Sequence, residues 1–251
     1  MPDKRTHRGP APEDDRLFCA DQIPPLRQAV EDYSWLLSRD YAQPSALKLV
    51  GDHWGLDRRQ RLAVMRSACS DQQLTRRRQT QIQPTEAAGR ILLVDGNNIL
   101  ISLEAALGGA YLFVGRDGCV RDLSGLHGTW RKVSQTLPAI ELSAAAIDQI
   151  SPSRVRWLLD RPVSNSGRLK TILEKFIKKD GRPWTVELHQ NPDKILRQSS
   201  DLVATSDSVI LDDCLQWLNF IQFALKIHPC TDRPLAIIDL QSKSIPEKPL
   251  I

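Results

Sequence analysis

Three acidic side chains stand where short apolar runs end, and they are the residues of this 251-residue chain best placed to do chemistry. Asp95 ends the run LLVD, Asp160 ends RWLLD and Asp207 ends VATSD. Each run is typical of a buried parallel strand. Parallel strands present their carboxyl ends at one edge of the sheet, where α/β proteins bind ligands. We therefore expect these three carboxyl groups to converge on one site.

Carboxylates crowded together repel each other unless a cation lies between them. A donor set of oxygen atoms without Cys or His favours Mg²⁺ or Mn²⁺. Such an ion would activate water and neutralise charge developing on a phosphate. Glu104 lies seven residues after Asn97 on the same face of a predicted helix, and Asp122 ends a predicted hairpin. Both acids are expected to join the metal ligands.

Small polar residues surround the three acids and are predicted to contact substrate. Their hydroxyl and amide groups can donate hydrogen bonds to phosphate oxygens, as can the free N–H groups of a helix N-terminus. The predicted substrate-binding residues of this kind are Asn97, Ser164, Ser166, Ser206 and Ser208. An aspartate before a helix is also an ordinary N-cap, which explains any single one of the three better than a metal site does. Three on one edge favour a site.

The pattern of apolar residues divides the chain into three parts. Residues 1–20 are polar and contain prolines, and we expect a disordered tail. Residues 21–83 are predicted to form a helical, arginine-rich domain in which Gly51 and Gly55 end a helix. Residues 90–251 alternate strands with helices, which predicts an α/β domain with a mainly parallel sheet. Within it we expect a hairpin around Arg116-Asp117-Gly118, a long helix over 209–225 and a last strand over 235–239.

Seven arginines and one acid occur within residues 58–83. Arginine's planar fork suits phosphate, and Arg58, Arg61 and Arg66 flank the apolar stripe of a predicted helix. One interpretation is a surface that contacts the phosphates of a nucleic acid. The alternative is a solvated surface, or arginines that pair with acids of the second domain. The sequence leaves both interpretations open.

Composition excludes several other classes of protein. The chain has 34 basic and 30 acidic residues, a net charge of +4 and 41% apolar residues, which is typical of a globular protein. Its five cysteines are scattered without a CxxC pair, which disfavours zinc and disulfides and favours a cytoplasmic location. No apolar run is long enough for a membrane span. No P-loop, GxGxxG or GxSxG motif occurs.

Four motifs together resemble an uncharacterised prokaryotic family with a PIN-like domain: LLVDGNNILISLEAAL, GCVRDLSG, LLDRPVSNSG and VATSDSVILDD. The N-terminal run LVGDHWGLDRRQRLAVMRSAC is similar to that family's helical companion domain of unknown function. The resemblance implies a PIN-like three-layer α/β domain preceded by a small all-α domain. It also implies that Asp95, Asp160 and Asp207 bind metal, with Glu104 and Asp122 supporting them.

PIN-like domains at large are metal-dependent ribonucleases, and VDGNN resembles the first-strand motif of their NYN branch. The leading hypothesis is therefore an Mg²⁺- or Mn²⁺-dependent endoribonuclease-like hydrolase, with RNA favoured over DNA as its substrate. Many active relatives carry a second acid where this chain has Ser208. A catalytically inactive nucleic-acid-binding module is thus one alternative, and a phosphatase or nucleotide-processing enzyme is another. The formation of a homo-oligomer is left open.

Overall fold

The main sheet is parallel throughout. In the computed structural model, the described residues are 8–124, 128–228 and 234–241. The strands of this sheet are β1 (Ile91–Asp95), β4 (Arg154–Asp160), β5 (Trp184–His189), β6 (Leu202–Ala204) and β7 (Trp217–Leu218). They lie in the order β5-β4-β1-β6-β7, and each neighbouring pair is parallel. The prediction of an α/β fold with a mainly parallel sheet is confirmed.

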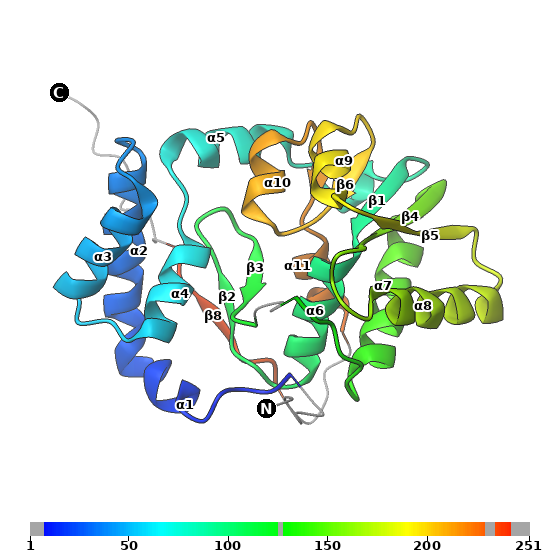
Figure 1. The fold of residues 1–251 in the computed structure, drawn as a ribbon. Helices are drawn as coiled ribbons and strands as arrows, with labels where there is room; N and C mark the ends of the chain where they lie inside the picture. The colour runs from blue at the N-terminus through cyan, green and yellow to red at the C-terminus, as the bar shows by residue number, and fades with distance from the viewer. Residues whose placement is uncertain (1–7, 125–127, 229–233, 242–251) are drawn as a thin grey trace.

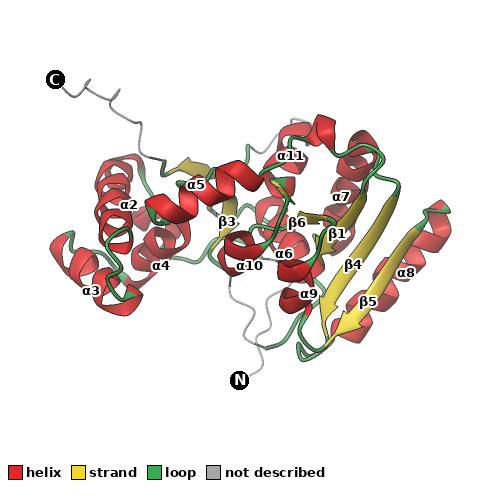
Figure 2. Cartoon of the chain, turned by 90° about the horizontal axis from the view of Figure 1, so that it is seen from above, coloured by secondary structure: helices red, strands yellow, loops and turns green. Residues whose placement is uncertain are grey.

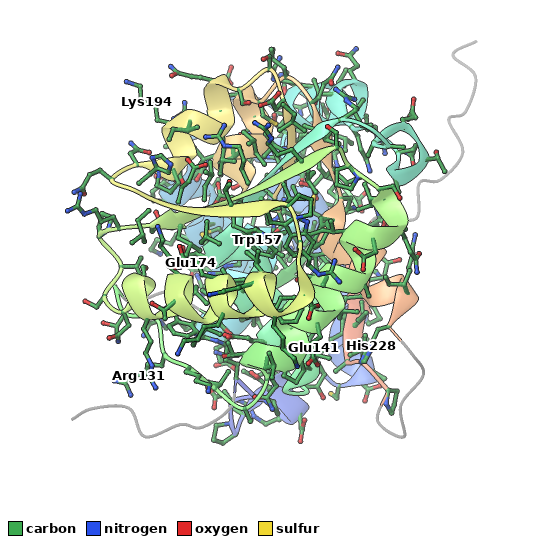
Figure 3. The ribbon with its side chains drawn as sticks, turned by 90° about the vertical axis from the view of Figure 1, so that its right-hand side faces the viewer. Arg131, Glu141, Trp157, Glu174, Lys194 and His228 are labelled. Atoms are coloured by element: carbon green, nitrogen blue, oxygen red, sulfur yellow. The ribbon has the colours of Figure 1, made fainter. Side chains whose placement is uncertain are left out.

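Helices cover both faces of the main sheet (Figure 2). Alternation along β1 explains this, because Leu92 and Val94 face one apolar cluster while Leu93 faces another. The first cluster includes α6 (Gly96–Leu107), α7 (Thr136–Ile150), α8 (Ser166–Asp180) and α11 (Phe220–Ile227). The second includes α9 (Pro192–Gln198) and α10 (Ser208–Asp213). Figure 3 looks onto α8, with the buried Trp157 of β4 in the layer behind it.

A second, smaller sheet has the order β3-β2-β8. Its strands are β2 (Leu112–Val114), β3 (Val120–Asp122) and β8 (Ile237–Asp239). The antiparallel pairing of β2 with β3 confirms the predicted hairpin, and Gly118 in its turn has a φ of 77° that favours glycine. The last predicted strand does not extend the main sheet, because β8 pairs in parallel with β2.

The N-terminal helices pack against this small sheet, which lies between them and the main sheet (Figure 1). They are α1 (Asp14–Leu17), α2 (Ile23–Leu37), α3 (Gln43–His53), α4 (Arg58–Ser67) and α5 (Asp71–Thr80), with short 3₁₀ turns at Ala20–Gln22 and Pro84–Glu86. Their apolar core also contains Phe113, Leu123, Ile238 and Leu240. The helical region and the α/β region therefore share a core across the small sheet. None of the described helices is long and apolar enough to span a membrane.

Three local expectations need correction. Residues 8–20 of the predicted disordered tail are packed, since Leu17 is buried and the buried Asp14 pairs with Arg59 at 2.6 Å; residues 1–7 lie outside the described residues. Gly51 lies inside α3, where a Cβ atom would clash with the Arg61 guanidinium. The predicted helix over 209–225 is split into α10, β7 and α11, because the buried Trp217 pairs with β6.

Candidate acidic active site

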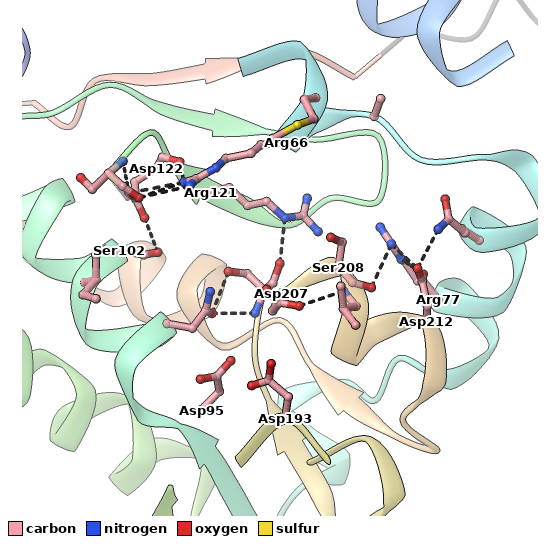
Figure 4. Close-up of a pocket in the computed structure, with 18 of the residues that line it drawn as sticks. Arg66, Arg77, Asp95, Ser102, Arg121, Asp122, Asp193, Asp207, Ser208 and Asp212 are labelled. Atoms are coloured by element: carbon pink, nitrogen blue, oxygen red, sulfur yellow. Dashed lines mark hydrogen bonds and ion pairs between the residues drawn. The ribbon is translucent and has the colours of Figure 1, made fainter. Parts of the chain in front are cut away.

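A cleft of about 510 Å³ lies between the N-terminal helices and the carboxyl edge of the main sheet (Figure 4). Tyr33, Leu37 and Met65 line it from the helical side. The sequence-predicted residues that line the cleft are Arg66, Asp95, Asn97, Asp122, Asp160, Ser206, Asp207 and Ser208. Residues that are far apart in the chain thus share one cavity, which is what the strand-end argument predicts.

The parallel topology explains why three of the acids meet. Asp95 is the last residue of β1 and Asp160 is the last residue of β4. Asp207 precedes α10, three residues beyond the end of β6. Because β1 lies between β4 and β6 and all three strands run the same way, their carboxyl ends are neighbours. Asp95 leads directly into α6 and Asp207 into α10, and residues of both helices also line the cleft.

Asp95 lies at the bottom of the cleft and is 5% exposed. Burial raises the pKa of its carboxyl group, and repulsion from Asp207, Asp193 and Asp160 raises it further. A hydrogen bond of 2.7 Å from the Thr205 hydroxyl opposes this change, yet the pKa reaches about 8. Burial and repulsion therefore make the ionised form of Asp95 unfavourable in the protein alone.

Asp193 is a further acid of the cleft, which the sequence analysis missed. It lies in the first turn of α9, after the end of β5, so the strand-end rule that singled out the other acids could have found it. Burial and repulsion from Asp207 raise the pKa of Asp193, while Arg197 lowers it. Burial, Asp193 and Asp207 likewise raise the pKa of Asp160. These acids influence one another because they occupy the same confined space.

Asp207 does two things at once. Its Oδ1 accepts hydrogen bonds from the backbone N–H groups of Val209 at 2.8 Å and Ile210 at 3.3 Å, which is an N-cap of α10. Asp207 is therefore a helix N-cap, as the alternative interpretation of this residue predicted. The same carboxylate also lines the cleft, where it repels Asp95. Asp95, in contrast, makes no side-chain hydrogen bond that caps α6.

Two asparagines tie the strand ends together. The Oδ1 of Asn97 accepts a hydrogen bond from the backbone N–H of Asp160 at 2.9 Å. The Oδ1 of Asn98 accepts from both the N–H and the hydroxyl of Ser206, each at 2.9 Å. Asn97 is 2% exposed, and within the described residues its Nδ2 has no hydrogen-bond partner. The Nδ2 of Asn97 is therefore a buried donor that the protein leaves unsatisfied.

The donor set fits a divalent cation in its chemistry. The cleft offers carboxylate and amide oxygens, as Mg²⁺ and Mn²⁺ prefer, and no described Lys, Arg or His forms an ion pair with Asp95, Asp160, Asp193 or Asp207. However, no group of three Asp, Glu, His or Cys side chains among the described residues is arranged to hold a metal ion. The acids share a cavity without forming a finished coordination shell.

Glu104 does not join the other acids, which corrects the expectation that it supports a metal. Its carboxylate is fully buried, forms an ion pair of 2.5 Å with Arg8 and accepts a hydrogen bond of 2.6 Å from Thr136. It lies on the same face of α6 as Asn97 but about two turns further along the helix, where it meets Arg8 of the N-terminal segment instead of the cleft. Asp122 does line the cleft, and it accepts hydrogen bonds from Ser102 and Ser124.

Ser164 and Ser166 also lie outside the residues that line the cleft. Ser164 forms a backbone bridge with Thr129, and Ser166 is buried at the start of α8. The segment between Asp160 and α8 therefore pairs with residues near Thr129 and does not line the cleft beyond Asp160. This corrects the expectation that these two serines contact substrate, which assumed that the loop stays beside Asp160.

Of the three arginines predicted to bind substrate, only Arg66 lines the cleft. Its guanidinium donates hydrogen bonds to the backbone oxygens of Asp122 and Ser124 and lies 3.8 Å from the Asp122 carboxylate. Arg61 is paired with Asp52 at 2.8 Å, and Arg58 is exposed at the start of α4.

Other arginines of the 58–83 segment follow the pairing interpretation. Arg59 forms two hydrogen bonds to Asp14, and Arg77 binds both Asp117 and Asp212. Arg76 donates to the backbone oxygen of Asp212. Much of the positive charge in this segment is therefore used within the protein, including across the boundary between α5 and α10.

The fold and the cleft define a two-part α/β protein in which an acidic sheet edge faces a helical wall. Residues 84–223 match a family described as a domain of unknown function, DUF5616, and the chain belongs to this family. Residues 25–80 match a protein family of unknown function, DUF434. Neither match is to a PIN-like family. The comparisons therefore support two domains of unknown function, and the PIN-like nature of the α/β domain stays a prediction.

Similarity to one curated protein extends over most of the chain. An uncharacterised protein of Methanocaldococcus jannaschii is 31% identical over 192 residues, which cover 74% of this chain and 88% of that protein. No solved structure matches this chain significantly. The comparisons therefore identify the family and leave the chemistry to be argued from the cleft.

Proposed function

We propose that this protein is a divalent-cation-dependent hydrolase of phosphodiester bonds, with RNA preferred over DNA. The crowding of aspartates in one cleft is the observation that carries the proposal. Burial raises the pKa of Asp95 to about 8, and repulsion from Asp207, Asp193 and Asp160 adds to that change. A cation bound among these carboxylates would relieve their repulsion, which gives the cleft a physical reason to select one.

The residues have separate roles in this proposal. Asp95, Asp160 and Asp207 would hold Mg²⁺ or Mn²⁺, with Asp193 beside them. The ion would supply an activated water and neutralise charge on the phosphate. Asn97 lines the cleft and binds the backbone of Asp160, and it would help to orient a phosphate oxygen.

Arg66 is the best candidate for a contact to the nucleic-acid backbone. Its close hydrogen bonds go to backbone oxygens, its guanidinium lies 3.8 Å from the Asp122 carboxylate, and it lines the cleft, where it would meet a phosphate. The preference for RNA rests on the resemblance to PIN-like domains. Arg58 is exposed and can extend the contact beyond the cleft, whereas Arg61 is held by Asp52.

A small phosphate ester, such as a nucleotide, is the second candidate substrate. The volume of about 510 Å³ lies in the range of roughly 300–1,000 Å³ that is usual for small-ligand sites. The pairing of Arg59, Arg61 and Arg77 within the protein also reduces the surface available to a long polyanion. In this case the same acids would act on a substrate that enters the cleft whole.

Two measurements on the full chain test the proposal. The first is calorimetric titration with Mn²⁺, and the second is incubation with RNA, single-stranded DNA and a panel of nucleotides in Mn²⁺. We expect Asp95→Asn to abolish cleavage and to leave RNA binding intact or tighter. Asp21→Asn makes the same chemical change at an exposed position remote from the cleft and should behave as the wild type.

The possible results separate the candidates. Cleavage of nucleotides alone would favour the second candidate. Binding of RNA without Mn²⁺ binding or cleavage would favour a non-catalytic binding module, for which the lack of an assembled metal-holding group among the described residues is the supporting observation. A wild-type protein that binds no Mn²⁺ and cuts nothing would refute the proposal.

A further inference from the structure

A buried ionic network borders the cleft: Arg77 and Arg121 line the cleft, and both bind Asp117 in the turn between β2 and β3. The Asp117 side chain is 1% exposed and accepts a hydrogen bond of 2.6 Å from Arg77 and two, of 2.9 and 2.7 Å, from Arg121. It also accepts the backbone N–H of Cys119 at 3.1 Å. Burial alone would raise the pKa of Asp117, but the two guanidinium groups outweigh it and lower the pKa to about 2.

The two arginines reach from Asp117 to the backbone on either side of Asp207. The Nε of Arg121 donates to the Ser206 carbonyl oxygen at 2.7 Å. The Nη2 of Arg77 donates to the Ser208 carbonyl oxygen at 3.2 Å. In Figure 4, Arg121 lies above Asp207 and Arg77 lies to the right of Ser208. The segment is thus held at the residue before Asp207 and at the residue after it.

This backbone segment sets the geometry at the bottom of the cleft. The backbone N–H of Asp207 donates to the Thr205 hydroxyl at 3.0 Å, and that hydroxyl donates to the Asp95 carboxylate at 2.7 Å. The Ser206 hydroxyl and N–H bind Asn98. A shift of the Ser206 or Ser208 carbonyl would therefore be transmitted to both Asp207 and Asp95.

The network needs arginine rather than a positive charge alone. A guanidinium has five N–H donors in a planar fork, so Arg77 can bind Asp117, Asp212 and the Ser208 carbonyl together. A lysine ammonium is a compact charge that cannot span these three acceptors. Arg77 belongs to α5, so the N-terminal helical region supplies part of this support.

We propose that Asp117, Arg77 and Arg121 are positioning residues of the acidic cleft, and that α5 is therefore part of the site rather than a separate binding arm. Asp117 fixes the two guanidinium groups, and they fix the carbonyl oxygens that flank Asp207. The importance of this network for catalysis rests on the proposed function of the cleft. The placement of Asp207 itself can be measured without any activity.

The test uses Arg77→Lys, which keeps the charge and removes the fork. Asp207 accepts the Val209 and Ile210 N–H groups, so hydrogen exchange of these two amides reports on its position. We expect both amides to exchange at least about tenfold faster in Arg77→Lys, while the amide of Leu93 in β1 keeps its wild-type rate. Mn²⁺ affinity should fall by about tenfold.

Arg182→Lys is the matched control. Arg182 also binds a carboxylate, that of Asp148, through two nitrogens, but it precedes β5 at the opposite edge of the sheet from the cleft. Exchange at Val209 and the affinity for Mn²⁺ should keep their wild-type values in this variant. Arg121→Lys frees the Ser206 carbonyl and is the second variant, for use if Arg77→Lys does not fold.

Each outcome decides the proposal. Unchanged exchange at Val209 and Ile210 in a folded variant would overturn it. Uniform acceleration across the sheet, or loss of folding in both variants, would assign the network to general stability and also overturn it. Selective acceleration in a protein whose wild type binds no Mn²⁺ would support the positioning role and refute the proposed function instead.

Discussion

The pKa of Asp95 makes the stability of the protein depend on pH in a direction opposite to that of most carboxylates. The buried carboxyl group has a pKa of about 8, against an ordinary value of 3.8. Between these values the folded protein retains a proton that the unfolded chain releases. The free energy of unfolding therefore falls as the pH rises through this window. Above about pH 8 both states are ionised at this residue, and its effect becomes constant.

The substitution Asp95→Asn isolates this effect, because an amide resembles the protonated carboxyl group and never ionises. Its Oδ1 can still accept the hydrogen bond from Thr205. At about 1.4 kcal/mol per pH unit, the interval from 3.8 to about 8 corresponds to a maximum of about 6 kcal/mol. We expect the two proteins to be similarly stable near pH 4, and the variant to be more stable by several kcal/mol near pH 9.

Urea unfolding at pH 5, 7 and 9 measures the difference directly, since other titrating groups are common to both proteins. Mn²⁺ added at pH 9 should stabilise the wild type, by about 2.7 kcal/mol at a hundredfold excess over its Kd. It should stabilise Asp95→Asn much less. A stability difference that is the same at pH 5 and pH 9 would refute the reasoning, because it would show that Asp95 ionises as freely in the folded protein as in the unfolded chain.

Three further substitutions test other parts of the argument. Glu104→Gln should lower the free energy of unfolding by about 1–3 kcal/mol, because it removes the charge that Arg8 binds, and should leave Mn²⁺ affinity unchanged; a weaker affinity would return Glu104 to the site. Gly96→Ala should cost about 1–3 kcal/mol in thermal unfolding, since the new Cβ would stand 3.0 Å from the Leu158 oxygen, and a wild-type Tm would contradict this. Asp193→Asn should weaken Mn²⁺ binding about tenfold by calorimetry, or about 1.4 kcal/mol, whereas an unchanged affinity would place Asp193 outside the ion's surroundings.

Local patterns in the sequence were sufficient to predict β1, β4, β5 and β6 and the acids Asp95, Asp160 and Asp207, but not β7, which was expected to be helical. Apolar runs such as LLV mark β1 because a strand covered on both faces buries every side chain. Asp117 and Gly118 mark the hairpin because its turn needs a backbone conformation that glycine readily adopts. These features depend on residues adjacent in the chain. The convergence of Asp95 and Asp160 then follows from parallel strand geometry alone.

Tertiary structure decided which charged groups are available for chemistry. Glu104 and Arg77 are residue types that often act in binding or catalysis. In this protein, however, Glu104 forms an ion pair with Arg8, and Arg77 forms ion pairs with Asp117 and Asp212. Their partners come from segments at least 40 residues away, so no local pattern reveals the pairing. A buried charge is stable only with a nearby counter-charge or a ligand. The three-dimensional fold therefore determines which acids form ion pairs within the protein and which, like Asp95, lie in the cleft without an ion-pair partner among the described residues.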